Sequence, residues 1–350
     1  MIKKGIIALG LLTTLNAYSQ DVNPYTPGTM EEGIVYYLPK TQIGIQVTAT
    51  KVTYTPGELC QYANRYLRMN DVSSQPNEYW EIKDIHVYTI GVPDIGKAYS
   101  IKLKDKSVAS QVELTENGII KAINTTHPTK KNVVPLNETP PAKRIDPRSF
   151  MTEEMLLAGS TNKMAELIAR EIYNIRESKN SLTRGQADYM PQDGAALKIM
   201  LDNLETQEKA LTSMFSGWTE RSNHTFTFYV EPKEEIHDQI VFRFSKKQGI
   251  VKENDLSGEP IYITITDETT IPPADEEAKS KKKVIGVIYN IPGKARVSID
   301  SMNKNYFEDE LIIAQFGETE VLIDNLFNKK VNTRVIFDTK TGGIMKIDKD

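Results

Sequence analysis

The 350-residue sequence predicts an α+β protein with a β-rich N-terminal module, a central α-helical hairpin and a C-terminal antiparallel β-sandwich or partly open barrel. Two observations predict this class. Apolar and polar residues alternate near both ends of the chain, as in half-buried strands, and apolar residues recur at helical spacing in the middle. Hydrophobic residues at 39% and charged residues at 26% are typical of a soluble globular chain. We therefore expect five segments, at residues 1–19, 20–123, 124–150, 151–217 and 218–350.

The first nineteen residues are expected to be a signal peptide. Two lysines precede a short apolar run from Gly5 to Leu15, and Ala17 and Ser19 are the small residues that a signal peptidase reads. That run is too short to span a bilayer, and no later segment is long and apolar enough to be a membrane helix. We expect cleavage between Ser19 and Gln20. The mature protein is then soluble, has no transmembrane anchor and is exported to a periplasm or the cell surface.

Residues 20–123 are expected to be mostly strands. Alternation predicts one strand around Ile43 to Val47 and another around Tyr99 to Leu103. Between them, the turn at Pro56 and Gly57 opens a helical stretch whose apolar residues fall on one face, at Leu59, Tyr62, Ala63, Tyr66 and Leu67. Residues 124–150, rich in Pro, Thr and Lys, are expected to be a linker.

Residues 151–217 are expected to form the helical hairpin. Thr152 is a plausible helix start because two glutamates follow it, and Gly217 marks the end of the second helix. Residues 218–350 return to strand alternation, first at Phe226 to Val230 and then in several later runs. The acidic and then basic stretch from Asp275 to Lys283 is expected to be a solvated loop.

The composition excludes several function classes. The formal net charge of -4 argues against a nucleic-acid partner, which usually needs a basic face. One cysteine and four histidines exclude a disulfide framework and the usual Cys/His zinc site. His224 and His237 are expected on neighbouring strands of one hairpin, where two histidines are more often surface residues than a metal site. We therefore name no catalytic residue, no metal ligand and no cofactor.

Three short motifs match the sequence motifs of a class of serine enzymes. Ser160 to Lys163 matches S-x-x-K, Ser178 to Asn180 matches S-x-N and Lys340 to Gly342 matches K-T-G, which is the order found in penicillin-binding proteins. The first two lie about five helical turns apart on one expected helix, so they point to different places along it. The third is expected to be a tight turn. We interpret Ser160 as a small residue that lets its helix pack closely.

Eight short blocks of the sequence are similar to one known family. They lie at Tyr36 to Thr41, Tyr54 to Leu59, Tyr62 to Leu67, Ile172 to Ser178, Pro191 to Gly194, Ile291 to Gly293, Ala314 to Gly317 and Thr341 to Gly343. In these blocks the chain resembles an exported Bacteroidetes family, the domain-of-unknown-function family numbered 4831. The resemblance covers nearly the whole mature chain. It implies export and a shared architecture, and it transfers no activity and no catalytic residues.

One modification signal agrees with export. Asp300, Ser301 and Met302 match the D-[ST]-apolar sequon that Bacteroidetes use for O-glycosylation of exported proteins. Ser301 is therefore the candidate modification site.

These observations lead to two functional hypotheses. The first is a non-enzymatic binding or assembly scaffold of the cell envelope, whose partner is another envelope protein or a glycan. The alternative is a hydrolase of an envelope or dietary polymer that uses an Asp/Glu pair as general acid and base. A cleft between the modules that holds two carboxylates within about 5–10 Å of each other, with aromatic residues beside them, would favour the hydrolase.

Overall fold

A computed structural model describes residues 22–24, 33–102, 112–128, 145–191, 193–269, 286–322 and 333–349. The helices are η1 (Cys60–Tyr62), α1 (Ala63–Leu67), η3 (Pro147–Phe150), α2 (Glu153–Leu156), α3 (Thr161–Thr183) and α4 (Gly194–Ser216). The strands are β1 (Val22–Pro24), β2 (Gly33–Thr55), β3 (Asn77–Lys102), β4 (Val112–Leu114), β5 (Ile120–Ile123), β6 (Trp218–Val230), β7 (Ile236–Ser245), β8 (Gly249–Val251), β9 (Glu259–Asp267), β10 (Val287–Asp300), β11 (Asn305–Leu322), β12 (Thr333–Phe337) and β13 (Ile344–Lys349). The expected signal peptide with its cleavage site, residues 129–144 of the expected linker and the loop at 275–283 lie outside the described residues.

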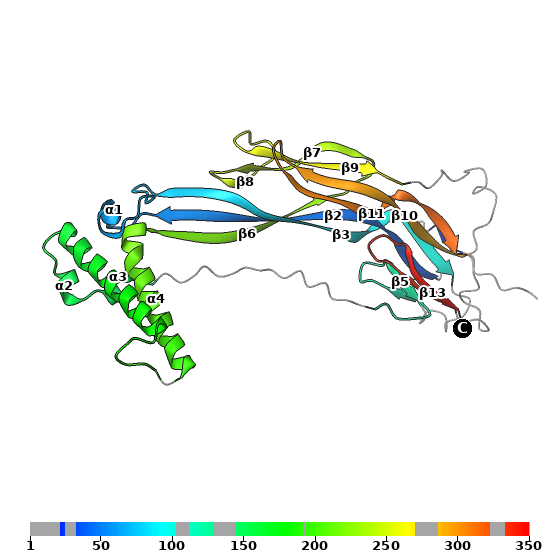
Figure 1. Cartoon of the computed structure of the whole chain (residues 1–350). Coiled ribbons are helices and arrows are strands. Elements are labelled where there is room, and N and C mark those ends of the chain that lie inside the picture. Colours follow the sequence, from blue (N-terminus) through cyan, green and yellow to red (C-terminus); the bar gives the residue numbers. More distant parts are fainter. Residues whose placement is uncertain are drawn as a thin grey trace, which may run out of the picture.

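A long antiparallel ribbon organises the molecule. β2 and β3 pair from Gly33 and Lys102 at one end to Tyr54 and Asn77 at the other. β6 adds a third strand along β2, and β1 pairs with the end of β3, so that the sheet order is β1-β3-β2-β6. Figure 1 shows the helices at one end of this ribbon and β5 and β13 near its other end.

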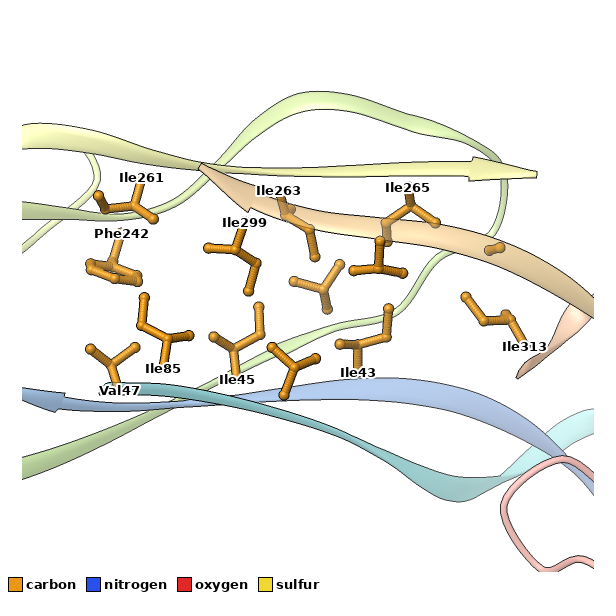
Figure 2. Close-up of a cluster of buried hydrophobic side chains, with 14 residues drawn as sticks. Ile43, Ile45, Val47, Ile85, Phe242, Ile261, Ile263, Ile265, Ile299 and Ile313 are labelled. Carbon is orange, nitrogen blue, oxygen red and sulfur yellow. The ribbon is translucent and has the colours of Figure 1, made fainter. Parts of the chain in front are cut away.

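A second sheet, in the order β11-β10-β9-β7-β8, packs on one face of the ribbon. The odd-numbered residues Ile43, Ile45 and Val47 of β2 point into this interface, as the alternation predicts. Figure 2 shows them facing side chains of the second sheet, among them Phe242, Ile261, Ile263, Ile265 and Ile299. Burying one such side chain completely contributes about 1.5–3 kcal/mol, so this interface is a major source of stability.

The structure is rich in antiparallel sheet and contains a sandwich, but the two β modules expected at residues 20–123 and 218–350 do not fold as separate units. The sandwich forms between strands of the N-terminal and C-terminal regions, and β6 belongs to the N-terminal sheet. Alternation in a sequence reveals which face of a strand is buried, but it does not reveal which strand is its partner.

A third, smaller sheet in the order β13-β12-β5-β4 packs beside the start of β2. Its core joins Tyr36 and Leu38 to Ile120, Val335 and Phe337, all of them fully buried. This sheet also pairs distant regions, because β5 lies against β12. The turn between β12 and β13, at residues 338–343, contacts the ribbon near Pro39 to Thr41.

The helices pack at the far end of the ribbon. The apolar side of α3 and the second half of α4 pack against Leu59, Ala63 and Leu67, which lie in and just before η1 and α1. Thr152 accepts a hydrogen bond from Met155 N and so caps α2, as its position predicts. α4 ends at Gly217, whose φ of +70° is a conformation that favours glycine. Within the part of the chain that the structure describes, no helix is long and apolar enough to cross a membrane.

Candidate functional site

A cleft of about 370 Å³ lies where the helices meet the end of the ribbon; we call it the junction cleft. Its walls come from three parts of the chain that are far apart in sequence: the end of β2 with the segment after it, the start of η3, and the end of α4 with the start of β6. The lining residues are Thr55, Pro56, Gly57, Glu58, Asp146, Pro147, Arg148, Ser213, Met214, Gly217 and Trp218.

The cleft is built by close backbone contacts. Leu59 N donates a hydrogen bond of 2.8 Å to Met214 O, which fixes the segment after β2 against α4. A Cβ on Gly57 would overlap with the same carbonyl group, so only glycine allows this approach. Gly217 then turns the chain sharply from α4 into β6, and this turn places Trp218 in the wall.

Charged groups meet at the opening of the cleft. Arg148 Nη2 lies 3.2 Å from Glu58 Oε1, and both side chains are more than 60% exposed. Asp146 Oδ1 accepts a hydrogen bond of 3.0 Å from Arg148 N and so caps η3. Met214 is buried and Trp218 is half-buried, so the cleft combines a polar opening with an apolar wall.

Both carboxylates of the cleft interact with other groups of the protein. The cleft does hold two carboxylates, those of Glu58 and Asp146, beside an aromatic ring. However, Glu58 is paired with Arg148, and Asp146 accepts a backbone hydrogen bond, so each carboxylate already has a structural partner. Glu58 forms an exposed ion pair, and Asp146 caps η3. An exposed guanidinium beside a tryptophan is well suited to contact a partner.

The predicted modification site is at the tip of a hairpin. Ser301 lies in the turn between β10 and β11, where Ser301 N donates a hydrogen bond of 2.8 Å to Lys304 O. The next residue, Met302, is 80% exposed. The other predicted site, Ser19 and Gln20, is outside the described residues.

The three enzyme-like motifs do not converge. Ser160 is the N-cap of α3 and accepts a hydrogen bond of 3.2 Å from Lys163 N, so its role is capping rather than close packing. Ser178 is exposed further along the same helix. Lys340 to Gly342 forms the expected tight turn, at the other end of the ribbon.

The two histidines also stay apart. His224 is on β6, in the first sheet, with its ring centroid 5.0 Å from that of Trp80. His237 is on β7, in the second sheet, near Glu235. The expected hairpin pairing is therefore wrong, because β6 pairs with β2 and β7 pairs with β9. Among the residues described, no three His, Cys, Asp or Glu side chains gather as metal ligands would.

Sequence reasoning missed the junction cleft. Arg148 lies in the segment 124–150 that is expected to be a linker, and Trp218 lies at the start of the expected C-terminal strand region. The signals that point to the cleft are the glycines at 57 and 217, each beside the end of an element.

Comparisons with known proteins give one match. A family model described as "Domain of unknown function (DUF4831)" matches residues 32–345. No curated protein and no solved structure matches the chain. The matched range includes all three lining segments of the junction cleft.

Proposed function

The chain belongs to the DUF4831 family, and we propose that it is an exported, non-enzymatic scaffold of the cell envelope that binds a protein partner at the junction cleft. The family description assigns no activity, so the proposal rests on the geometry of this chain.

One observation carries the proposal: the cleft is formed where the helical unit joins the end of the ribbon. The helices have their own apolar core, and the sandwich has another, with the ribbon running between them. Paired backbone hydrogen bonds along β2, β3 and β6 make that ribbon a stiff spacer. A partner seated in the cleft contacts the helical unit and the ribbon at once, which is how a scaffold fixes the position of what it binds.

The envelope location is supported by the N-terminal sequence. The lysines, the short apolar run and the small residues before Gln20 have the composition of a signal peptide. Fractionation of cells, with N-terminal sequencing of the recovered chain, tests this part. We expect a first residue of Gln20 and recovery from the envelope or the medium. A chain that keeps its first nineteen residues in the cytoplasm would contradict export.

Crosslinking in intact cells tests the scaffold. We expect the tagged chain to be recovered with one protein partner in stoichiometric yield. Arg148→Glu should lower that yield strongly, because it reverses the charge at the opening of the cleft. Arg170→Glu is the matched control, since Arg170 is also 64% exposed and pairs with a glutamate, Glu166, on the surface of α3.

Three results would count against this proposal. A monodisperse monomer with no crosslinked partner would count against a scaffold. Equal losses for Arg148→Glu and Arg170→Glu would place the partner elsewhere on the molecule. Hydrolysis of an envelope polymer by the purified chain, abolished by Glu58→Gln, would favour the hydrolase.

A further inference from the structure

We propose that the ribbon carries a second binding surface, separate from the junction cleft, that takes a neutral polysaccharide. The surface is the side of the ribbon turned away from the sandwich, and we call it the open face. It consists of the even-numbered residues of β2 from Gly44 to Tyr54 and the residues directly paired with them in β3 and β6. Gly44, Thr50 and Val52 are themselves buried, so at these positions the accessible groups belong to the paired residues of β3 and β6.

Strand register defines the open face. Directly paired residues of antiparallel strands point to the same side, and successive residues alternate. Ile43, Ile45 and Val47 point into the sandwich core, so the even-numbered residues of β2 point away from it. On β6, the paired residues Thr225, Thr227 and Tyr229 are exposed.

Aromatic rings form one end of the open face. The ring of Tyr88 covers Gly44: a Cβ added to Gly44 would lie 2.5 Å from the Cζ atom of Tyr88. Gly44 is directly paired with Tyr88 on one side and with Tyr229 on the other, so the two tyrosines lie on the same side of the ribbon around this glycine. Burial, and then a hydrogen bond with Tyr229, raise the pKa of Tyr88. The ring of His86 is stacked beside Tyr88, with centroids 5.9 Å apart and planes inclined by 22°. Tyr229 is 55% exposed, so a flat aromatic surface remains open to a ligand.

A polar pocket forms the other end. It has a volume of about 570 Å³, within the range of ligand sites, and lies where the open face meets the loop after α1. Tyr79 and Asn77 contribute from the ribbon, and Asp71 and Gln75 contribute from the loop. Tyr54 also lines the pocket, but its hydroxyl is already bonded to the carbonyl groups of Ser73 and Ser216. Phenol, amide and carboxylate groups together donate and accept hydrogen bonds, as a ligand rich in hydroxyl groups requires.

Hydroxyl and amide groups connect the two ends. Gln46 and Thr48 lie on β2, beside Thr227 and Thr225 on β6. From Gly44 to Tyr54, at about 3.3 Å per residue, the face is about 33 Å long. That length suits a chain of several sugar units better than a single small molecule.

The charges of the open face point to a neutral ligand. Arg221 Nη1 lies 2.6 Å from Glu81 Oε1, so the arginine of the open face is already paired with a carboxylate. Asp84 adds a negative charge and is exposed. An anionic polymer would be repelled by Asp84 and would have to compete with Glu81 for the arginine. A neutral polysaccharide meets no such cost, while its hydroxyl groups bond the amides and its sugar rings stack on the tyrosines.

Affinity electrophoresis of the purified mature chain tests the proposal. The neutral probes are soluble β-glucan, glucomannan and dextran, and alginate is the anionic probe. We expect at least one neutral probe to slow the chain in a native gel, and alginate to leave it unchanged. Tyr229→Ala should weaken binding roughly threefold to tenfold, the effect of losing one aromatic contact. Tyr189→Ala is the matched control, because Tyr189 is 80% exposed in the turn between α3 and α4.

A second variant distinguishes a specific loss of binding from misfolding. Thr225→Arg with Thr227→Arg places two long charged side chains on the open face at exposed positions, so we expect an unchanged melting temperature and no binding. Retardation by none of the neutral probes would overturn the proposal. So would retardation by alginate alone, equal losses for Tyr229→Ala and Tyr189→Ala, or a protein crosslinked to the open face. None of these results bears on the junction cleft, which has no residue on the even-numbered part of β2.

Discussion

The side-chain amide of Gln315 pairs with the main chain of Thr41 as a neighbouring strand would. Thr41 N donates to Gln315 Oε1, and Gln315 Nε2 donates to Thr41 O, each at 2.8 Å. The Thr41 hydroxyl also accepts from Ala314 N at 3.0 Å and donates to Lys340 O at 3.1 Å. One fully buried threonine on the ribbon thus joins the sandwich sheet to the β12–β13 turn.

Replacing Gln315 should therefore destabilise the protein. Gln315→Leu keeps most of the side-chain volume but leaves the N–H and C=O of Thr41 without their partners. An orphaned buried group costs about 1–3 kcal/mol, so the variant should lose at least that much free energy of unfolding. Urea denaturation measures the loss. Gln248→Leu, in an exposed turn, should stay within about 0.5 kcal/mol of the parent.

Gly91 has a close contact that Gly159 lacks. A Cβ on Gly91 would overlap with Thr339 O in the β12–β13 turn, whereas nothing lies within 4 Å of a Cβ on Gly159. Gly91→Ala should lower the free energy of unfolding by about 1–3 kcal/mol, because the backbone must move. Gly159→Ala should be neutral or stabilising by up to about 1 kcal/mol. Thermal melts of the two variants compare them directly, and equal melting temperatures would contradict the described contact.

Ser160 and Ser178 should respond in opposite ways to alanine. Ser160→Ala removes the N-cap of α3 and should cost about 1 kcal/mol. Ser178→Ala changes an exposed position inside the same helix, where alanine is the better helix former, so stability should stay equal or rise slightly. Denaturation by guanidinium checks both. A larger effect at Ser178 would mean that the helix does not start at Thr161.

Glu208 should make the helical unit sensitive to acid. Burial alone would raise its pKa, but hydrogen bonds from Arg176 and Lys179 outweigh burial and lower it. A lowered folded-state pKa stabilises the protein above the unfolded carboxyl pKa of about 4.3, and the contribution disappears as the pH falls through the folded value.

Glu208→Gln should therefore cost up to about 1 kcal/mol at pH 7, and the difference from the parent should shrink below about pH 4. Urea titrations at several pH values measure this. Glu177→Gln, an exposed glutamate on α3, should give a smaller difference at every pH. A difference that stays constant down to pH 2 would rule out the ionised pair as its cause.

Ser301 is expected to carry a glycan in its native host. Ser301 is half-buried in its turn, where its hydroxyl accepts a hydrogen bond from Asn303 N, and the adjoining Met302 is exposed. Intact mass measurement of the chain from that host should exceed the mass of the bare polypeptide, and Ser301→Ala should remove the difference. Ser257→Ala, in another turn, should leave the mass difference in place.

Local patterns predicted the elements well. Alternation located strand segments of β2 and β6, at Ile43 to Val47 and at Phe226 to Val230, because one face of each strand is more buried than the other. Helical spacing and Thr152 located the helical region between residues 151 and 217, since capping and amphipathicity depend only on neighbouring residues.

The pairing of strands that are distant in sequence could not be predicted from these local patterns. The alternation of Phe226 to Val230 is the same whether β6 pairs with β7 or with β2. In either arrangement the same side chains of β6 point toward the core, so the pattern cannot identify the partner strand. The junction cleft depends on the same long-range placement, as Glu58, Arg148 and Trp218 become neighbours only after the ribbon and helices have packed.

The pairing of β2 with β6 also determines when the protein can fold during its synthesis. β6 begins 163 residues after β2 ends, and the sandwich sheet is completed only with β11. A ribosome adds about 5–20 residues per second, so it needs on the order of tens of seconds to synthesise the chain from the end of β2 to the end of β11. Throughout that time the hairpin of β2 and β3 exposes Ile43, Ile45 and Val47 with no opposing sheet. A chain interrupted before β11 therefore keeps an uncovered apolar sheet face, the kind of surface that causes aggregation and that holdase chaperones bind.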